Sequence, residues 1–198
     1  MVHQMENDFI LTLYSRSETV FTLRELLLLF PQISYNNLKS KIHYFAMRGK
    51  MQRLRTGIYA KTRYNPLELV KIYTPSYISL ETVLQREGLI FQYSRNITAI
   101  SYVSRTVTVG ETVLKYKKMN DRILLNNEGI RIDNGYCIAS KERAFLDTLL
   151  LYGDFHFDTV DPLCWDTVFL YQKLYANKSL EKRVQHYYQN WKEQKTHV

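Results

Sequence analysis

The chain of 198 residues lacks several features that would assign it to a specialised class of protein. It has only two cysteines, Cys137 and Cys164, and they lack CxxC spacing, so we expect two buried thiols rather than a disulfide or a metal site. It has no run of about 18 apolar residues, which predicts that no segment spans a membrane. Its N-terminus has no basic segment followed by an apolar stretch, so we expect no secretory signal and a cytoplasmic location.

The sequence also lacks the motifs of the common nucleotide-binding and hydrolytic enzymes, because GxxxxGK[ST], GxGxxG, GxSxG and HExxH are all missing. One set of metal-ligand residue types occurs close together, but its spacing matches no standard zinc pattern. The set consists of His156, Asp158, Asp161 and Cys164. We therefore expect no metal and no cofactor.

A second candidate catalytic site is a group of charged residues within residues 140–152. Lys141, Glu142 and Asp147 are residue types that a nuclease uses, but nuclease carboxylates mostly converge from strands. Here the pattern predicts a helix capped by Ser140, and Glu142 falls in its first turn, where a negative charge meets the helix dipole favourably. A structural role is thus favoured, and we expect that the protein is not an enzyme.

Acidic residues are missing from one long stretch, residues 34–63, which holds eight lysines or arginines. The whole chain has a net charge of +8, and residues 1–64 hold ten basic and four acidic side chains, a balance of +6. Residues 65–198 hold seventeen and fifteen, a balance of +2. A basic surface of this kind attracts polyanions, and nucleic acid is the expected partner.

The N-terminal third predicts three helices, near residues 6–14, 22–30 and 34–48. The second begins with a capping box, in which Thr22 and Glu25 bond each other's backbone N–H groups. It ends before Pro31, and a three-residue turn leads to the third helix, capped by Ser34. On that helix Leu38, Ile42 and Phe45 form an inward stripe at helical spacing. Two helices joined by such a turn are typical of a helix-turn-helix.

A short hairpin is predicted after Gly49, with strands at residues 51–55 and 58–60 and a turn at Thr56-Gly57. Alternation along the first strand places Arg53 and Arg55 on one side. Leu54 would lie on the other side and cover the small helical core. The helix-turn-helix and its hairpin therefore predict a winged helix that binds double-stranded DNA.

The expected DNA contacts divide by residue type. Lysine and arginine side chains supply phosphate affinity that is independent of sequence, whereas Asn, Ser and His side chains read base edges. The expected DNA-binding residues are Asn36, Asn37, Lys39, Ser40, Lys41, His43, Arg48, Arg53, Arg55 and Lys61. Three tyrosines, Tyr35, Tyr44 and Tyr59, either contact phosphates or pack in the core.

The remainder of the chain predicts a second domain, residues 65–198, that begins at Asn65-Pro66 with a short helix. Ser79 would cap the next helix, which ends at Gly88. Short β-branched and aromatic runs then predict a mostly antiparallel sheet, with a hairpin at Asp133-Asn134-Gly135. The expected strands are residues 97–102, 106–109, 113–116, 122–125, 130–132 and 136–138. Helices would follow at residues 140–152, 166–175 and 180–193, which makes the fold class α+β.

Three segments of the sequence resemble segments of the AbiEi family of bacterial antitoxins and occur in the same order as in that family. The resemblance covers roughly residues 6–155. Gly49, Leu54, Arg55, Gly57, Ile58 and Tyr59 match the family's G-x(4)-L-x-x-G-[IL]-Y segment. PSYISLETVLQREGLI, from Pro75, and IASKERAFLDTLLL, from Ile138, are similar to two later family segments. The resemblance implies that the protein binds inverted repeats and represses its own operon. It also implies that the C-terminal domain counters a nucleotidyltransferase-like toxin.

Two other functions remain open at this point. A ligand-sensing winged-helix transcription factor without a toxin would need a pocket of a few hundred Å³ in the C-terminal domain, as small-molecule sites do. A nuclease targeted by its winged helix would need Glu142 and Asp147 in a metal site, and it is the less favoured of the two.

Overall fold

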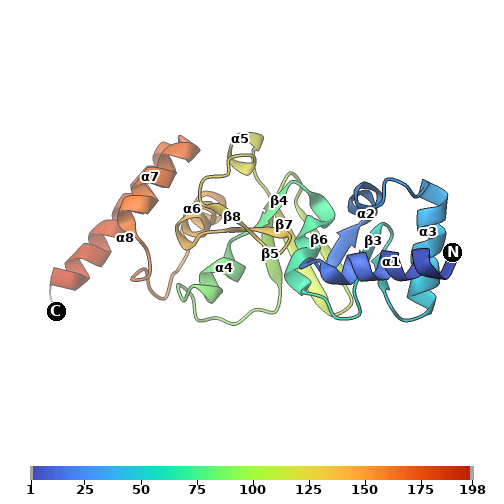
Figure 1. The fold of residues 1–198 in the computed structure, drawn as a ribbon. Helices are drawn as coiled ribbons and strands as arrows, with labels where there is room; N and C mark the ends of the chain where they lie inside the picture. Colours follow the sequence, from blue (N-terminus) through green and yellow to red (C-terminus); the bar gives the residue numbers. More distant parts are fainter. Residues whose placement is uncertain (1, 197–198) are drawn as a thin grey trace.

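A computed structural model describes residues 2–196 of the chain. Its parts follow one another along the long axis in sequence order (Figure 1). The N-terminal helices lie at one end, a sheet and its helices occupy the middle, and the two C-terminal helices lie at the other end. The fold is mixed α+β, and five of the seven strand pairings within residues 2–196 are antiparallel. Within the same residues, no helix combines the length and the apolar character needed to cross a membrane.

The N-terminal unit has three helices and a three-stranded antiparallel sheet of order β1-β3-β2. Its elements are α1 (Val2–Ser15), β1 (Val20–Thr22), α2 (Leu23–Leu29), α3 (Tyr35–Met47), β2 (Gln52–Arg55) and β3 (Ile58–Ala60). The three predicted helices and the predicted hairpin are confirmed. The sheet has one strand more than predicted, because β1 pairs with β3. A three-residue strand whose partner lies almost forty residues away leaves no local periodicity to detect.

The predicted capping box at the start of α2 is confirmed. The backbone N–H of Glu25 donates to the Thr22 hydroxyl at 3.1 Å, and the N–H of Thr22 donates to the Glu25 carboxylate at 2.6 Å. These bonds fix where α2 begins and how the chain turns from β1 into it.

Replacing Thr22 by alanine should therefore cost about 1 kcal/mol of the free energy of unfolding, because one backbone donor loses its acceptor. For a chain of this size the midpoint of thermal unfolding should fall by about 2–4 °C. Scanning calorimetry of Thr22→Ala and Thr22→Ser measures this, and the serine variant, which keeps the hydroxyl, should stay close to the parent protein. Equal midpoints for the two variants would show that the cap contributes nothing.

Two hydrophobic cores meet at the three-stranded sheet. The smaller core lies among α1, α2, α3 and one face of the sheet. The larger core belongs to the rest of the chain, and it includes Val20, Ile58 and Ala60 from the other face of the same sheet. Along β3, Tyr59 points into the smaller core, whereas its neighbours Ile58 and Ala60 point into the larger one. Strands β1 and β3 are thus covered on both faces, and the two parts of the chain pack directly against each other.

The junction between the two parts is a 3-10 helix, η1 (Pro66–Tyr73), with Asn65 as its N-terminal cap. The Glu68 side chain is 1% exposed and accepts hydrogen bonds from the backbone N–H groups of Thr19 and Val20 and from the Thr19 hydroxyl. Lys71 donates to the Val20 carbonyl at 2.8 Å and lies 3.4 Å from the capping carboxylate of Glu25. The junction therefore joins η1 to both β1 and α2.

The second sheet has six strands in the order β6-β7-β5-β4-β9-β8. They are β4 (Ser76–Ile78), β5 (Ile97–Ser101), β6 (Arg105–Val109), β7 (Thr112–Lys118), β8 (Ile130–Asp133) and β9 (Tyr136–Ala139). The sheet is mixed, because β5 runs parallel to β7 and β4 runs parallel to β9. The predicted hairpin at residues 133–135 is confirmed: Asn134 and Gly135 both have positive φ, as a tight turn requires.

Two predictions for this part are wrong, one of a strand and one of a helix cap. Residues 122–125 do not form a strand, since the Asn120 side chain caps a short helix, α5 (Asp121–Leu124). Ser79 does not cap α4 (Glu81–Arg86), because its hydroxyl donates to the buried Asp147 carboxylate at 2.8 Å. In addition, β4 was not predicted, although it lies near the centre of the sheet.

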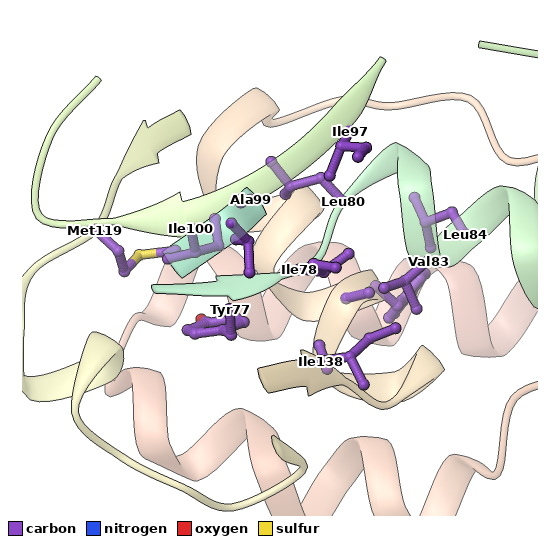
Figure 2. Close-up of a cluster of buried hydrophobic side chains, with 14 of the residues drawn as sticks. Tyr77, Ile78, Leu80, Val83, Leu84, Ile97, Ala99, Ile100, Met119 and Ile138 are labelled. Carbon is purple, nitrogen blue, oxygen red and sulfur yellow. The ribbon is translucent and has the colours of Figure 1, made fainter. Parts of the chain in front are cut away.

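Helix α6 (Lys141–Tyr152) lies at the centre of the larger core, with Glu142 through Leu149 all buried. Helices α4, α7 (Trp165–Tyr175) and α8 (Lys178–Thr196) pack against it. Figure 2 shows part of this core, where side chains of β4, α4, β5 and β9 gather around Ile78 and Ile138.

Candidate nucleic-acid interface

Helix α3 has one buried and one exposed face, as its sequence predicted. Leu38, Ile42 and Phe45 are buried in the smaller core. Burial of this stripe fixes the rotation of the helix, so the polar face must point outward. The predicted DNA-binding residues exposed on α3 and at its C-terminal end are Asn36, Asn37, Lys39, Ser40, His43 and Arg48.

The position of α3 depends on the turn that follows α2. The backbone N–H of Ile33 donates to the Phe30 carbonyl at 3.0 Å, which closes the turn. Ser34 occupies the N-cap position with extended geometry, but its side chain makes no capping hydrogen bond. The place of the predicted cap is thus correct, and its hydroxyl bond is missing.

A groove of about 390 Å³ lies between the exposed face of α3 and the β2–β3 hairpin. Lys39 and His43 line it from the helix, and Arg53 lines it from the hairpin. The other lining residues are Leu23, Tyr35, Ile42, Ala46, Thr56, Gly57 and Tyr59. The lining includes two permanent positive charges and no carboxylate, so the groove suits an anionic ligand.

Two exposed tyrosines of α3 stack with basic side chains, and of these two pairs only Tyr35 and Lys39 line the groove. The Lys39 ammonium lies 4.4 Å from the centre of the Tyr35 ring, and the Arg48 guanidinium lies 5.2 Å from the centre of the Tyr44 ring. Such contacts restrict long basic side chains and hold their charges near the helix surface. Tyr59 is buried, so of the three tyrosines considered only Tyr35 and Tyr44 are available for contact.

The two hairpin arginines lie on opposite faces of the sheet, which corrects the prediction that they share one side. Arg53 is paired with Tyr59, and Arg55 with Ile58, with a register shift between the two pairs. Because Tyr59 and Ile58 point into different cores, Arg53 points toward α3 and Arg55 toward the rest of the chain. Leu54 also differs from prediction, since it packs against the larger core.

Arg55 belongs to a second basic cluster, centred on Tyr73 at the end of η1. The Arg105 guanidinium donates to the Tyr73 hydroxyl at 3.0 Å. Burial acts to raise the pKa of Tyr73, but Arg105 and Arg55 outweigh it and lower that pKa. Arg105 comes from β6, and no sequence pattern linked it to the hairpin.

Lys61 and Lys41 also lie away from the groove. Lys61 is 8% exposed, and its ammonium donates to the Arg16 carbonyl at 2.7 Å, so it stabilises the end of α1. Lys41 lies on the side of α3 that faces α1, with its ammonium 5.7 Å from the centre of the Phe9 ring. The structure thus brings together Lys39, His43 and Arg53, and it separates Arg55, Lys41 and Lys61 from them.

The residues considered for a metal site are dispersed. His156 and Asp158 line one cavity, whereas Asp161 accepts from the Trp191 indole and pairs with Lys195 at 3.0 Å. Among the side chains that the structure describes, residues 8–196, no group of three or more His, Cys, Asp or Glu is placed to hold a metal. The expectation of two buried thiols is wrong, since Cys137 is half-buried and Cys164 exposed; both are free.

The carboxylates considered for a nuclease site are both buried and bonded to the protein. Asp147 is completely buried and accepts from the hydroxyls of Tyr77, Ser79 and Tyr175 at 2.7–3.0 Å. The Arg143 Nε lies 3.6 Å from its carboxylate, and both side chains are fully buried. Burial raises the pKa of Asp147, while the Arg143 charge and the three hydroxyl donors act in the opposite direction. This arrangement suits a structural network that joins β4, α6 and α7.

Glu142 also has a structural role, at the start of α6. It is 6% exposed, and its carboxylate accepts from the backbone N–H of Cys164 at 3.3 Å. The bond ties the start of α6 to the segment before α7.

Comparison of the chain with protein-family models gave no match, and comparison with curated proteins gave none either.

Proposed function

We propose that the chain is a DNA-binding repressor of the antitoxin type, with a winged helix at its N-terminus. The element order α1-β1-α2-α3-β2-β3 and the antiparallel three-stranded sheet support the winged helix. The observation that carries the proposal is the groove between α3 and the hairpin, which has basic residues on both sides and no carboxylate. An α-helix is about 10–12 Å wide, and the major groove of DNA, about 12 Å wide, accepts it.

In this proposal α3 enters the major groove of double-stranded DNA. Its exposed Asn36, Asn37, Ser40 and His43 side chains read base edges, since short amide and hydroxyl groups match their donors and acceptors. Lys39, Arg48 and Arg53 contact the flanking phosphates. A single α3 makes few base contacts, so specific binding needs two copies on inverted half-sites.

The antitoxin part of the proposal rests on the resemblance of three segments to the AbiEi family. It assigns residues 1–64 to DNA binding and residues 65–198 to countering a nucleotidyltransferase-like toxin in the cytoplasm. Two of these segments fall in the larger core: the first spans β4 and α4, and the second spans the end of β9 and α6. The proposed activity is non-enzymatic, and the bonded state of Glu142 and Asp147 speaks against the nuclease alternative.

A ligand-sensing regulator without a toxin is the second candidate. One observation favours it, a cavity of about 550 Å³ between the loops at residues 90–94 and 155–158. This volume lies within the range of roughly 300–1,000 Å³ that small-molecule sites occupy.

The DNA-binding proposal is tested by comparing Arg53→Ala with Arg55→Ala. Loss of Arg53 should weaken binding to specific and random duplexes alike and lower the salt slope of log K by about 1, because one phosphate contact is lost. Fluorescence anisotropy with a duplex from upstream of the gene, at several salt concentrations, measures both quantities.

Arg55→Ala is the matched control, since it removes the same side chain two residues away on the opposite face of the sheet. Its affinity should stay near that of the parent protein. A larger loss for Arg55→Ala than for Arg53→Ala would place the DNA on the other face and refute the assignment of the groove.

A further inference from the structure

The cavity of about 550 Å³ in the C-terminal part of the chain is not used by the DNA-binding proposal. Glu81 lines it from the start of α4, and two loops supply the other walls. Those walls consist of Ile90, Phe91, Gln92, Tyr93, Ser94, Phe155, His156 and Asp158. The cavity is therefore aromatic, with acidic groups at two points.

Two large aromatic side chains beside the cavity are exposed to solvent. Phe91 and Tyr93 are each 72% exposed. Their loop is pinned at both ends, because the N–H of Phe91 donates to the Asp158 carboxylate at 2.6 Å and the N–H of Ser94 donates to the Gln85 side chain at 3.2 Å. The N–H of Asp158 also returns to the Leu89 carbonyl at 3.0 Å. An ordered loop that exposes two aromatic rings is typical of a contact surface rather than of a core.

The Glu81 carboxylate supplies negative charge at the same place. Its Oε2 atom is buried and has no hydrogen-bond partner. Burial raises the pKa of the Tyr152 hydroxyl, and the negative charge of the adjacent Glu81 and a hydrogen bond with its carboxylate add to that rise. Glu81 therefore places a carboxylate at the wall of the cavity, beside the Tyr152 hydroxyl.

The charge of the cavity is opposite to that of the whole molecule. The chain carries a net charge of +8, yet the cavity lining has two carboxylates, Glu81 and Asp158, and no lysine or arginine. The lining thus combines aromatic faces with negative charge, which is the chemistry that binds organic cations.

We propose that this cavity receives an arginine side chain of a partner protein. A guanidinium stacks on the faces of Phe91 and Tyr93 while its fork of N–H groups donates to the Glu81 carboxylate, and an ammonium can do only part of this. The cavity is larger than one side chain, so it accommodates the flanking residues of the partner as well. The inference does not depend on DNA binding.

A peptide titration of the full-length protein tests the proposal. The probes are acetyl-Gly-Arg-Gly-amide, the same peptide with citrulline in place of arginine, and free arginine amide. Chemical shifts of backbone amides at residues 81–95 and 152–158 report binding by NMR. The arginine peptide should bind with a Kd of about 1 mM or tighter. It should bind at least tenfold tighter than the citrulline peptide, which has the same shape without the charge.

Glu81→Gln should weaken binding of the arginine peptide at least tenfold, because the amide keeps the shape of the side chain and loses its charge. Glu111→Gln, at an exposed glutamate in the turn between β6 and β7, is the matched control and should leave the affinity unchanged. Tyr93→Ala changes only an exposed ring, and it should weaken binding about two- to fivefold even if Glu81→Gln disturbs the fold.

Three results would overturn the proposal. Equal binding of the arginine and citrulline peptides would exclude recognition of charge. Unchanged affinity in both Glu81→Gln and Tyr93→Ala would place the site elsewhere. Tighter binding of free arginine amide than of the peptide would make the cavity a small-molecule site, as in the ligand-sensing alternative.

Discussion

Replacing Asp147 by alanine should lower the free energy of unfolding by about 3–5 kcal/mol, because the Arg143 guanidinium then stays buried without its counter-ion. Arg143 cannot move into water, since it is fully buried and donates to the carbonyls of Ile123 and Glu128. The hydroxyls of Tyr77, Ser79 and Tyr175 lose their acceptor as well. Urea-induced unfolding followed by circular dichroism measures the loss.

Two further variants make this measurement specific. Lys195→Ala removes one partner of the exposed pair with Asp161 and should change the free energy of unfolding far less than Asp147→Ala does, because water screens the pair. The double variant Arg143→Met with Asp147→Leu replaces the buried charges by apolar side chains, and it should recover much of the stability. A loss below 1 kcal/mol in Asp147→Ala would show that the network contributes little to the fold.

Replacing Glu68 by alanine should cost about 3 kcal/mol or more, because a buried carboxylate that binds Thr19, Val20 and Lys71 is removed. The damage should concentrate at the junction, since Glu68 joins η1 to the start of β1. We therefore expect the N-terminal unit to unfold before the larger core. Scanning calorimetry should resolve two transitions, and limited proteolysis should cut near residues 62–66 more rapidly than in the parent protein.

Glu193→Ala is the control for this experiment, because it removes an exposed glutamate from α8, which lies at the end of the molecule opposite the N-terminal unit (Figure 1). A single transition with an unchanged midpoint in Glu68→Ala would contradict the role given to the junction. Parallel DNA-binding measurements add a functional readout, since an N-terminal unit that unfolds early should lose DNA affinity at a lower temperature.

Elements fixed by neighbouring residues were predictable from the sequence. The capping box of α2, the inward stripe of α3 and the Asn134-Gly135 turn all depend on contacts within a few residues, and all three are confirmed. Strands β1 and β4 have only three residues each, and their pairing depends on partners far along the chain. The run at residues 122–125 has β-branched and apolar character, but the Asn120 cap favoured a helical turn instead.

At the candidate interface, too, features that depend on neighbouring residues were predictable and features that depend on distant residues were not. Helical periodicity correctly placed Lys39 and His43 on the outer face of α3. The side taken by Arg55 depends on a register shift opposite Ile58, which simple alternation does not contain. The burial of Lys61 depends on the Arg16 carbonyl, whose position follows from the end of α1. Charge alone therefore overestimated the number of basic residues at the groove.

The three-stranded sheet sets a limit on how this chain can be engineered. A fragment that ends at residue 64 keeps Val20, Ile58 and Ala60 but loses the side chains that cover them. Exposed apolar patches of this kind promote self-association. The N-terminal unit therefore cannot be moved alone into another protein. A hybrid repressor would have to carry η1 and a matching apolar surface, or replace these three residues with polar ones.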